Sequence, residues 1–191
     1  MLRKEMAEKL AKISQEEIDR KSKIVFEKVK SSEWFIRSQR ISVFVNTAGE
    51  IKTDEIIKLA LLQNKEVFIP WFEKGNPRMF MVQLDTVKDF DNLKPTLWDI
   101  RQFESIDGKT TYDNTGPLHL ILAPGVAFTT AGDRCGHGMG FYDKFFVEHT
   151  GKSYPNAPAP YKVALALSEQ IIDKVPVDET DVKMDIVLAA D

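Results

Sequence analysis

Cysteine, long apolar runs and clustered basic residues are all scarce in this chain. Cys135 is the only cysteine, so neither an internal disulfide nor a cysteine-based zinc site is expected. No apolar run reaches the ~18 residues that a membrane-spanning helix needs. The formal net charge is −3 and no basic run offsets it, which argues against general nucleic-acid binding. The N-terminus lacks an apolar signal-peptide core, so we expect a cytoplasmic protein with no membrane partner.

Histidine is also scarce, and its spacing argues against several catalytic classes. The three histidines, His119, His137 and His149, do not form a metal-ligand pattern. The sequence shows no plausible Ser-His-Asp or Cys-His arrangement. Cys135 lies in a glycine-rich stretch, where it is either a nucleophile or a small residue that fits a tight loop. Because no base is evident near it, we favour the second interpretation.

The composition is that of a globular protein, with 43% apolar and 29% charged residues in a length of 191. This length suits one domain spanning residues 1–191. Strands alternate with helices, so we predict an α/β fold: a three-layer, Rossmann-like mixed β-sheet with helices on both faces. The expected strands are 41–45, 66–70, 78–84, 118–123, 163–167 and 186–189, and the expected helices are 2–12, those beginning at Ser14 and Thr53, and 141–149.

Local signals define several of these elements. Ser14 and Glu17 have the spacing of a capping box, and Thr53 precedes two acidic residues in an expected first helical turn. A short Gly-Asn-Pro turn precedes the strand at 78–84, which predicts antiparallel pairing. Residues 86–117 show little periodicity and several turn signals. We expect a long loop there, and a loop of this length is more often functional than idle.

The stretch from Leu118 to Phe146 carries the strongest functional signal. An apolar strand stops at Pro124-Gly125, a loop with Gly136-x-Gly138-x-Gly140 follows, and a helix begins near Phe141. Glycines let backbone N–H groups turn toward a ligand, and a helix N-terminus adds a positive dipole end. The alternative is a long turn that needs only flexibility. We favour phosphate binding, although the loop is neither a P-loop nor a G-x-G-x-x-G fingerprint.

Three side chains beside this loop suit phosphate chemistry. Asp143 lies in the expected first helical turn, where it either holds Mg²⁺ against a phosphate or simply complements the helix dipole. Arg134 suits bidentate contact with phosphate oxygens. His137 donates to a phosphate if protonated, or is an ordinary surface histidine. Together they indicate phosphate binding or phosphoryl transfer.

Outside the loop the signals are weaker. Trp71, Phe72, Phe80 and Trp98 either line a pocket for a flat aromatic ligand or belong to the core, and core is the commoner outcome. Glu50 follows a strand end, where α/β proteins bind ligands, yet a solvated turn carboxylate is the simpler interpretation. The charges of the first helices, which include Arg3, Lys4 and Lys9, read mainly as a solvated face.

The motifs resemble a known family. PGVAFTTAGDRCGHGMGFYDKFF is similar to the signature of 5-formyltetrahydrofolate cyclo-ligases, in which a P-G-hydrophobic-x-F segment leads into a basic, glycine-spaced loop ending in G-[YF]-Y-D. Further segments have counterparts in order: LRKEMAEKL, RISVFVNTAGEIKTDEII, FIPW, KPTLWDI, YKVALALSEQII and VPVDETDVKMDIVL. The resemblance therefore covers nearly the whole chain.

The resemblance implies an ATP- and Mg²⁺-dependent enzyme whose substrate is 5-formyltetrahydrofolate. In that family the formyl oxygen is thought to be phosphorylated, N10 attacks the activated carbon, and phosphate leaves as the ring closes to 5,10-methenyltetrahydrofolate. ADP and phosphate are the other products. A monomer is the default expectation.

The resemblance also implies roles for individual residues. Arg134, His137 and Tyr142 would be catalytic, and Asp143 and Asp181 would bind magnesium. The ATP positions would be Arg3, Arg134, Cys135, Gly136, His137, Gly138, Met139, Gly140, Phe141 and Tyr142. The folate positions would be Val45, Glu50, Trp98, His137, Gly138, Met139, Gly140 and Phe141, so Glu50 becomes an expected ligand of the pterin edge.

Three departures from the family pattern reduce the positive charge expected at the ATP site. A lysine usually found a few residues before the Arg3 position has no counterpart, although Lys4 is a possible substitute. His137 stands where arginine or tyrosine is frequent, and Met139 where lysine or glycine is common. We expect weaker nucleotide binding and an unchanged reaction, because one lost charge-assisted contact costs roughly 1.5–3 kcal/mol.

Two other functions are compatible with these residues. One is a folate- or nucleotide-binding module that keeps the fold without turnover, which the missing lysine and Met139 favour slightly. The other is a general phosphate-binding α/β protein, such as a sugar-phosphate sensor or isomerase. Tight folate binding without ATP consumption would indicate the first, and indifference to folate would indicate the second.

Overall fold

The computed structural model describes residues 1–191, and its centre is a six-stranded sheet in the order β10-β9-β6-β1-β2-β3. Neighbouring strands run parallel, except that β3 is antiparallel to β2. This mixed sheet confirms the predicted fold class and the antiparallel place of the strand expected at 78–84. The strands are β1 (Arg40–Val43), β2 (Glu66–Trp71), β3 (Phe80–Leu84), β6 (Leu120–Ala123), β9 (Tyr161–Leu165) and β10 (Ile186–Leu188).

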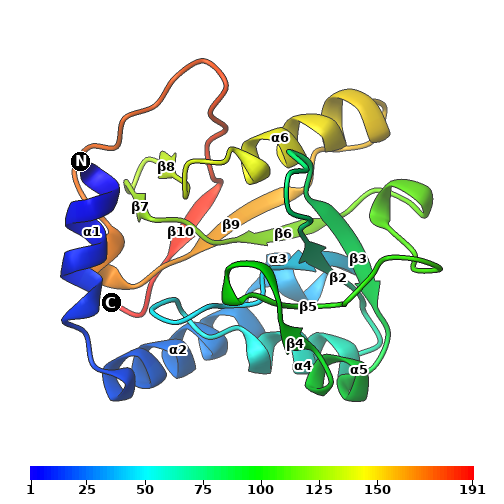
Figure 1. The fold of residues 1–191 in the computed structure, drawn as a ribbon, viewed down its shortest axis with the longest axis horizontal. Helices are drawn as coiled ribbons and strands as arrows, with labels where there is room; N and C mark the ends of the chain where they lie inside the picture. The colour runs from blue at the N-terminus through cyan, green and yellow to red at the C-terminus, as the bar shows by residue number, and fades with distance from the viewer.

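Helices cover the sheet from both sides. Figure 1 shows α2 and α4 below the sheet and α6 above it, with α1 standing at the end that also carries the C-terminus. The last residues are tied to α2, because Lys28 Nζ donates to the carbonyls of Ala189 and Ala190. The helices are α1 (Leu2–Ala11), α2 (Gln15–Lys30), α3 (Glu33–Ile36), α4 (Asp54–Leu62), α5 (Val87–Asp91) and α6 (Phe141–Glu148).

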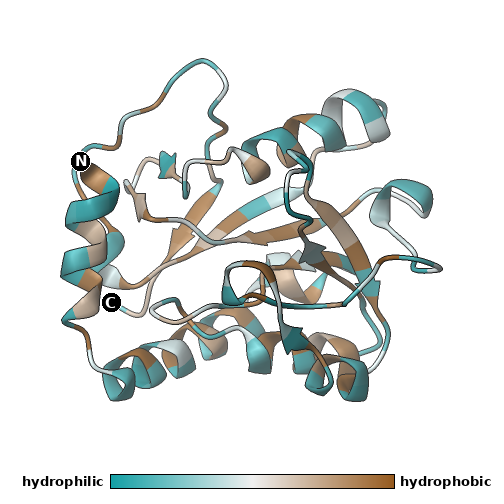
Figure 2. Cartoon of the chain, in the orientation of Figure 1, coloured by the Kyte–Doolittle hydropathy of each residue, from teal (hydrophilic) through white to brown (hydrophobic).

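The core lies between these layers. Figure 2 shows hydrophobic residues along the central strands and on the inward sides of the helices. All four residues of β6 are buried, as expected for a parallel strand covered on both faces. The main hydrophobic cluster contains 37 buried residues from strands and helices throughout the chain. Each fully buried Leu, Ile or Phe contributes about 1.5–3 kcal/mol relative to exposure, so this cluster is the main stabilising element of the fold.

The two predicted helix starts differ in detail. Ser14 is the N-cap of α2, and its Oγ accepts the backbone N–H of Glu17 at 3.1 Å. The Glu17 carboxylate pairs with Arg20, so only the Ser14 half of the capping box forms. Thr53 occupies the N-cap of α4 but caps nothing with its side chain. Its buried hydroxyl instead donates to the Phe44 carbonyl at 2.7 Å, which ties the start of α4 to the end of β1.

Residues 86–117 are more ordered than the expected long loop. They contain short helices and strands, and each of these elements is too short to show a period in the sequence. The glycine-rich loop likewise begins as a small hairpin of β7 and β8, which the sequence did not predict. The additional elements are β4 (Lys94–Pro95), η1 (Leu97–Asp99), β5 (Arg101–Gln102), η2 (Tyr112–Asn114), β7 (Ala127–Phe128), β8 (Arg134–Cys135), η3 (His149–Ser153) and η4 (Ser168–Gln170).

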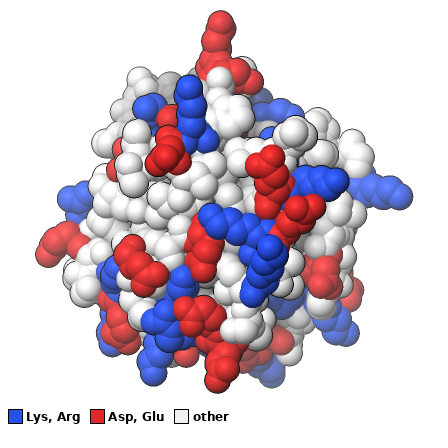
Figure 3. All heavy atoms as spheres, turned by 90° about the vertical axis from the view of Figure 1, so that its left-hand side faces the viewer, with Lys and Arg blue, Asp and Glu red and all other residues white.

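The surface carries no dominant charge on the face that includes α1. Figure 3 shows Lys and Arg side chains interspersed with Asp and Glu there, without a large patch of either sign. No helix combines the length and the apolar character needed to cross a bilayer.

Two of the three histidines have structural positions. The backbone N–H groups of Gln39 and Arg40 both point at His119 Nδ1, at 3.0 and 3.1 Å. His149 is fully buried, accepts the Leu118 N–H at Nε2 over 2.8 Å, and stacks on the Tyr112 ring. Burial lowers the pKa of His149 from 6.5 to about 4, so this histidine is neutral in the folded protein.

The buried His149 predicts a loss of stability in mild acid. As the pH falls below the unfolded pKa of 6.5, the unfolded chain binds a proton that the folded chain does not take up until about pH 4. The free energy of unfolding should therefore fall by about 2–3 kcal/mol between pH 7.5 and 4.5 from this group. Urea unfolding of wild type and His149→Gln measures it. Glutamine keeps an acceptor for Leu118 without titrating, so parallel pH profiles of the two proteins would contradict the assignment.

Candidate active site

A cavity of about 1410 Å³ opens at the carboxyl ends of β1, β2 and β6. This edge of a parallel sheet is where open α/β proteins bind ligands, because strand ends and helix N-termini converge there. The segments that line the cavity follow β1, β2 and β6 or come from α1, the η1 region, α6 and the chain before β10. All the predicted site residues lie in the lining: Arg3, Val45, Glu50, Trp98, Arg134, Cys135, Gly136, His137, Gly138, Met139, Gly140, Phe141, Tyr142, Asp143 and Asp181.

The glycine loop forms one wall and leads directly into α6. The loop continues from the β7–β8 hairpin and ends at Gly140, the N-cap of α6. Gly138 and Gly140 have φ values of 103° and 70°, a left-handed backbone that favours glycine. No side chain caps the start of α6, so its first N–H groups remain available for an anion.

Arg134 is buried at the base of this wall. Its Nε donates to the Pro124 carbonyl at 2.7 Å, and its guanidinium lies 5.2 Å from the centre of the Tyr142 ring. Nη1 lies 3.8 Å from Asp143 Oδ2. Burial lowers the pKa of Arg134, and the charge of Asp143 opposes that shift. The bond to Pro124 uses one of five guanidinium N–H groups, so the remaining donors suit an anion in the cavity.

Tyr142 adds a second unsatisfied donor. Its side chain is buried, and the hydroxyl has no hydrogen-bond partner. Burial raises the pKa of Tyr142, so the phenol stays protonated. An unpaired buried hydroxyl costs about 1–3 kcal/mol, which a ligand acceptor would recover.

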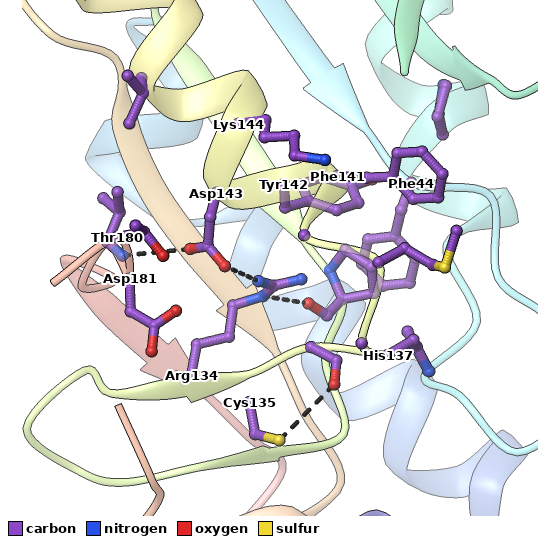
Figure 4. A pocket seen from close by; sticks show the side chains of 18 of the residues that line it. Phe44, Arg134, Cys135, His137, Phe141, Tyr142, Asp143, Lys144, Thr180 and Asp181 are labelled. Carbon is purple, nitrogen blue, oxygen red and sulfur yellow. Dashed lines mark hydrogen bonds and ion pairs between the residues drawn. The ribbon is translucent and has the colours of Figure 1, made fainter. Parts of the chain in front are cut away.

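Asp143 and Asp181 lie on opposite sides of a gap between α6 and the segment before β10 (Figure 4). Asp143 Oδ1 accepts the Val182 N–H at 3.1 Å, which ties that segment to the helix. Burial raises the pKa of Asp143, against the Val182 N–H and Arg134, and the charges of Asp181 and Asp178 raise it further. A cation between the carboxylates would relieve this repulsion.

These residues fit Mg²⁺ only together with other oxygen ligands. No three His, Cys, Asp or Glu side chains converge closely enough to hold a metal ion alone. Mg²⁺ usually binds through one or two carboxylates, several waters and substrate phosphates, so two carboxylates beside a loop that could hold a phosphate match its requirements.

An aromatic cluster forms another part of the lining, next to the start of α6. The rings of Phe72, Trp98 and Phe141 meet at centroid distances of 5.0 to 5.9 Å. Trp98 is 51% exposed, and its φ of 56° is a strained conformation for a residue with a side chain. Such strain costs about 1–3 kcal/mol and is concentrated at functional sites. Phe72 and Trp98 therefore line a pocket. Trp71 and Phe80 lie outside the lining and pack against each other as a cross-strand pair of β2 and β3.

Glu50 is held in place rather than solvated. Its Oε1 accepts the backbone N–H and the hydroxyl of Thr47, at 2.7 and 2.9 Å. Its Oε2 lies 3.9 Å from His137 Nε2. Only 15% of the Glu50 side chain is exposed, against 63% for His137. The simpler interpretation of Glu50 as a free turn carboxylate is therefore wrong.

The first helix supplies one cation to the cavity. Arg3 Nε donates to the Gly136 carbonyl at 2.8 Å, so α1 closes over the loop. Lys4 is absent from the lining, and its proposed substitution for the missing family lysine has no structural support. Cys135 packs in a small apolar cluster with Met6 and Val126, which supports its interpretation as a residue that fits a tight loop.

Sequence reasoning missed several residues of the lining. Phe44 and Thr47 immediately follow β1, and that position after a strand was their only signal. Lys144 lies within the quoted signature segment, one residue after the G-[YF]-Y-D pattern ends, and no role was assigned to it. The remaining omissions lie mainly on the last turns of α6 and before β10: Val147, Glu148, Gly151, Lys152, Pro176, Asp178, Glu179, Thr180 and Val182.

Fold and cavity together define an α/β protein with a glycine-rich loop and a buried arginine beside an aromatic slot. The 5-formyltetrahydrofolate cyclo-ligase family model matches residues 1–190. The chain is 53% identical over 187 residues to "Probable 5-formyltetrahydrofolate cyclo-ligase" of Caenorhabditis elegans, which covers 98% of this chain and 90% of that protein. It is 37% identical to the mouse (Mus musculus) 5-formyltetrahydrofolate cyclo-ligase, covering 100% of this chain and 92% of the mouse protein. The chain therefore belongs to the 5-formyltetrahydrofolate cyclo-ligase family, as its motifs suggested.

Two solved structures share the fold. A 5,10-methenyltetrahydrofolate synthetase from Mycoplasma pneumoniae aligns with a TM-score of 0.72 at 18% identity, covering 100% of this chain and 97% of that one. The Aquifex aeolicus 5,10-methenyltetrahydrofolate synthetase aligns with a TM-score of 0.74 at 24% identity, covering 97% and 86%. At these identities the likeness concerns the fold.

Gly132 packs so closely against Met184 that a side chain at this position should destabilise the protein. Its φ is 97°, and a Cβ there would lie 2.3 Å from the Met184 carbonyl oxygen. The Met184 N–H also donates to the Gly132 carbonyl at 2.8 Å, which holds the two segments together. Gly132→Ala should lower the free energy of unfolding by about 1–3 kcal/mol in urea denaturation. Gly151→Ala is the matched control, since its Cβ would meet nothing within 4 Å. Equal stability of the two variants would contradict this role.

Proposed function

We propose that this chain converts 5-formyltetrahydrofolate to 5,10-methenyltetrahydrofolate with consumption of ATP. The observation that carries the proposal is one cavity that combines a phosphate-binding loop, an acidic pair and an aromatic slot, in a chain that belongs to the cyclo-ligase family. In the proposed reaction an O–P bond forms at the formyl oxygen as the terminal phosphoryl group leaves ADP. The N10 lone pair then bonds to the formyl carbon, the C–O bond breaks to release phosphate, and N10 loses its proton.

The loop residues would bind and orient the nucleotide. The N–H groups of Gly136 to Gly140 and the start of α6 present donors, and Arg134 adds cationic donors from the base of the cavity. Arg3 braces the loop from α1 through the Gly136 carbonyl. Because phosphoryl transfer depends mainly on positioning and on charge stabilisation, these groups account for much of the proposed catalysis.

Asp143 and Asp181 would hold Mg²⁺, which supplies charge neutralisation to the phosphate oxygens. The Val182 N–H orients Asp143, and the Asp178 N–H orients Asp181 over 2.8 Å. Both carboxylates are thereby kept in place before any ligand binds, which limits the entropy lost on binding.

The folate would occupy the aromatic side. Phe72, Trp98 and Phe141 provide ring faces for a flat pterin and aminobenzoate. Glu50, fixed by Thr47, presents Oε2 as an acceptor for the polar edge of the pterin. His137 and Tyr142 also line the cavity, and each would serve as a donor to the formyl oxygen or to the transferring phosphoryl group.

The remaining attributes of the proposal follow the sequence analysis. We propose that residues 1–191 act as one catalytic domain and as a monomer, in the cytoplasm, within one-carbon metabolism. A binding module without turnover and a general phosphate-binding protein are the alternatives that the following assay separates.

The first prediction of the proposal is ATP-dependent formation of the methenyl product, followed by its near-ultraviolet band. Asp143→Asn should lower kcat/KM by about 10²–10³-fold, because it removes a charge from the metal and phosphate site while keeping an acceptor for the Val182 N–H. Asp91→Asn makes the same change on exposed α5 and should leave the rate unchanged.

Three outcomes are informative. Product that requires Mg-ATP and is lost in Asp143→Asn supports both the reaction and the metal role. Tight binding of 5-formyltetrahydrofolate without product would indicate a binding module. No folate binding would overturn the proposal in favour of a different phosphate ligand.

Glu50 provides a separate test of the folate side. Glu50→Gln retains an acceptor for Thr47 but can place a donor where Oε2 accepts. The KM for 5-formyltetrahydrofolate should rise about ten- to a hundredfold, as expected for one lost charge-assisted contact, with little change in the KM for ATP. Glu8→Gln on the exposed face of α1 is the control. A larger effect on ATP than on folate would place Glu50 in the wrong half of the cavity.

A further inference from the structure

The cavity is richer in carboxylates than in fixed cations. Met139 places an uncharged, exposed side chain in the middle of the loop. An anionic ligand therefore depends on every available cation as well as on bound metal. The acids of the lining are Glu50, Asp143, Glu148, Asp178, Glu179 and Asp181, and its lysines and arginines are Arg3, Arg134, Lys144 and Lys152.

Lys144 is a cation of the lining to which the proposed function assigns no role. It follows Asp143 on α6 and lies one turn beyond Gly140, so both residues are on the same side of the helix. Helical side chains lean toward the N-terminus and cover the preceding turn. Accordingly, a Cβ placed on Gly140 would lie 3.8 Å from Lys144 Cε, and the lysine stem covers the end of the glycine loop.

The ammonium of Lys144 is free to meet a ligand. The side chain is exposed, and Figure 4 shows it extending from α6 toward Phe141, with no interaction drawn at its nitrogen. The other cations near the loop are engaged. Arg3 donates to the Gly136 carbonyl, and Arg134 is fixed by the Pro124 carbonyl beside Asp143. Lys152 lies beyond α6, at the far end of the cavity wall.

We propose that Lys144 supplies the cationic phosphate contact that the loop lacks at Met139. The inference rests on the proposed function, since it takes the ligand to be a nucleotide polyphosphate. Glycines at 138 and 140 leave space above the loop, and a lysine anchored one turn into α6 reaches that space from the helix side. In this chain the positive charge is therefore delivered by α6 and not by the loop itself.

Isothermal titration with the non-hydrolysable analogue Mg-AMP-PNP tests the proposal without turnover. Lys144→Met should weaken binding of the analogue about ten- to a hundredfold, as expected for one lost charge-assisted contact. Lys144→Arg should keep the affinity within about threefold, because charge and reach are retained. Lys88→Met, at an exposed position on α5 outside the cavity, controls for loss of a surface charge.

A second-site variant makes the test specific. If Lys144 replaces a loop lysine, Met139→Lys should restore most of the affinity lost in Lys144→Met, and the two sites should be strongly non-additive. Affinity for 5-formyltetrahydrofolate should remain within about threefold of wild type in Lys144→Met. Circular dichroism establishes that each variant is folded.

The outcomes separate this inference from the proposed function. Wild-type affinity for Mg-AMP-PNP in Lys144→Met would overturn the role of Lys144 and leave the cyclo-ligase proposal intact. Loss of folate affinity in place of nucleotide affinity would overturn it too, by assigning Lys144 to the folate side. An equal loss in Lys152→Met would show that only the overall charge of the cavity matters. Absence of nucleotide binding by the wild type would overturn both proposals.

Discussion

The buried guanidinium of Arg134 is the interaction on which the rest of the site depends. It joins the end of β6, through the Pro124 carbonyl, to the first turn of α6, through Asp143 and the Tyr142 ring. Removing a charge from water costs several kcal/mol, and one hydrogen bond with a carboxylate at 3.8 Å does not fully compensate. The fold therefore maintains a cation that is incompletely satisfied and faces a cavity. An anionic ligand of the kind proposed would complete that environment at the point where the hairpin, the loop and the helix converge.

The same logic extends across the cavity. Tyr142 holds an unpaired hydroxyl, Trp98 has a strained backbone and an exposed ring, and Asp143 lies near other carboxylates. Each of these features is unfavourable in the free protein, and a different part of the proposed ligands would relieve each one: an acceptor, a flat ring or a divalent cation. Local instability of this kind is concentrated at binding sites, because evolution retains it only where a ligand compensates. The chemistry of the cavity thus agrees with the family to which the chain belongs.

Much of the fold could be predicted from the sequence, for reasons visible in particular elements. The apolar run at β6 and the alternation of strands and helices predicted the mixed sheet, and the short turn before β3 predicted the antiparallel direction of β3. Short elements escaped prediction because a two-residue strand such as β4 or β7 has no period to detect. Thr53 shows a different failure. The hydroxyl of an N-cap residue can accept a backbone N–H of its own helix or donate to a carbonyl elsewhere. Packing against β1 selected the second, with the Phe44 carbonyl as the acceptor.

The sequence by itself determined that the loop glycines, Arg134 and Asp143 meet at one site, because they lie within one short stretch and need only local geometry to come together. It also determined the family, through motifs that extend along nearly the whole chain. Only the tertiary structure decided which distant residues join that stretch. Glu50 is fixed by Thr47 rather than solvated, Lys4 is outside the cavity lining while Arg3 reaches Gly136, and Lys144 lies over Gly140. These outcomes depend on helix rotation, on side-chain direction and on contacts between segments more than a hundred residues apart, none of which a linear pattern encodes.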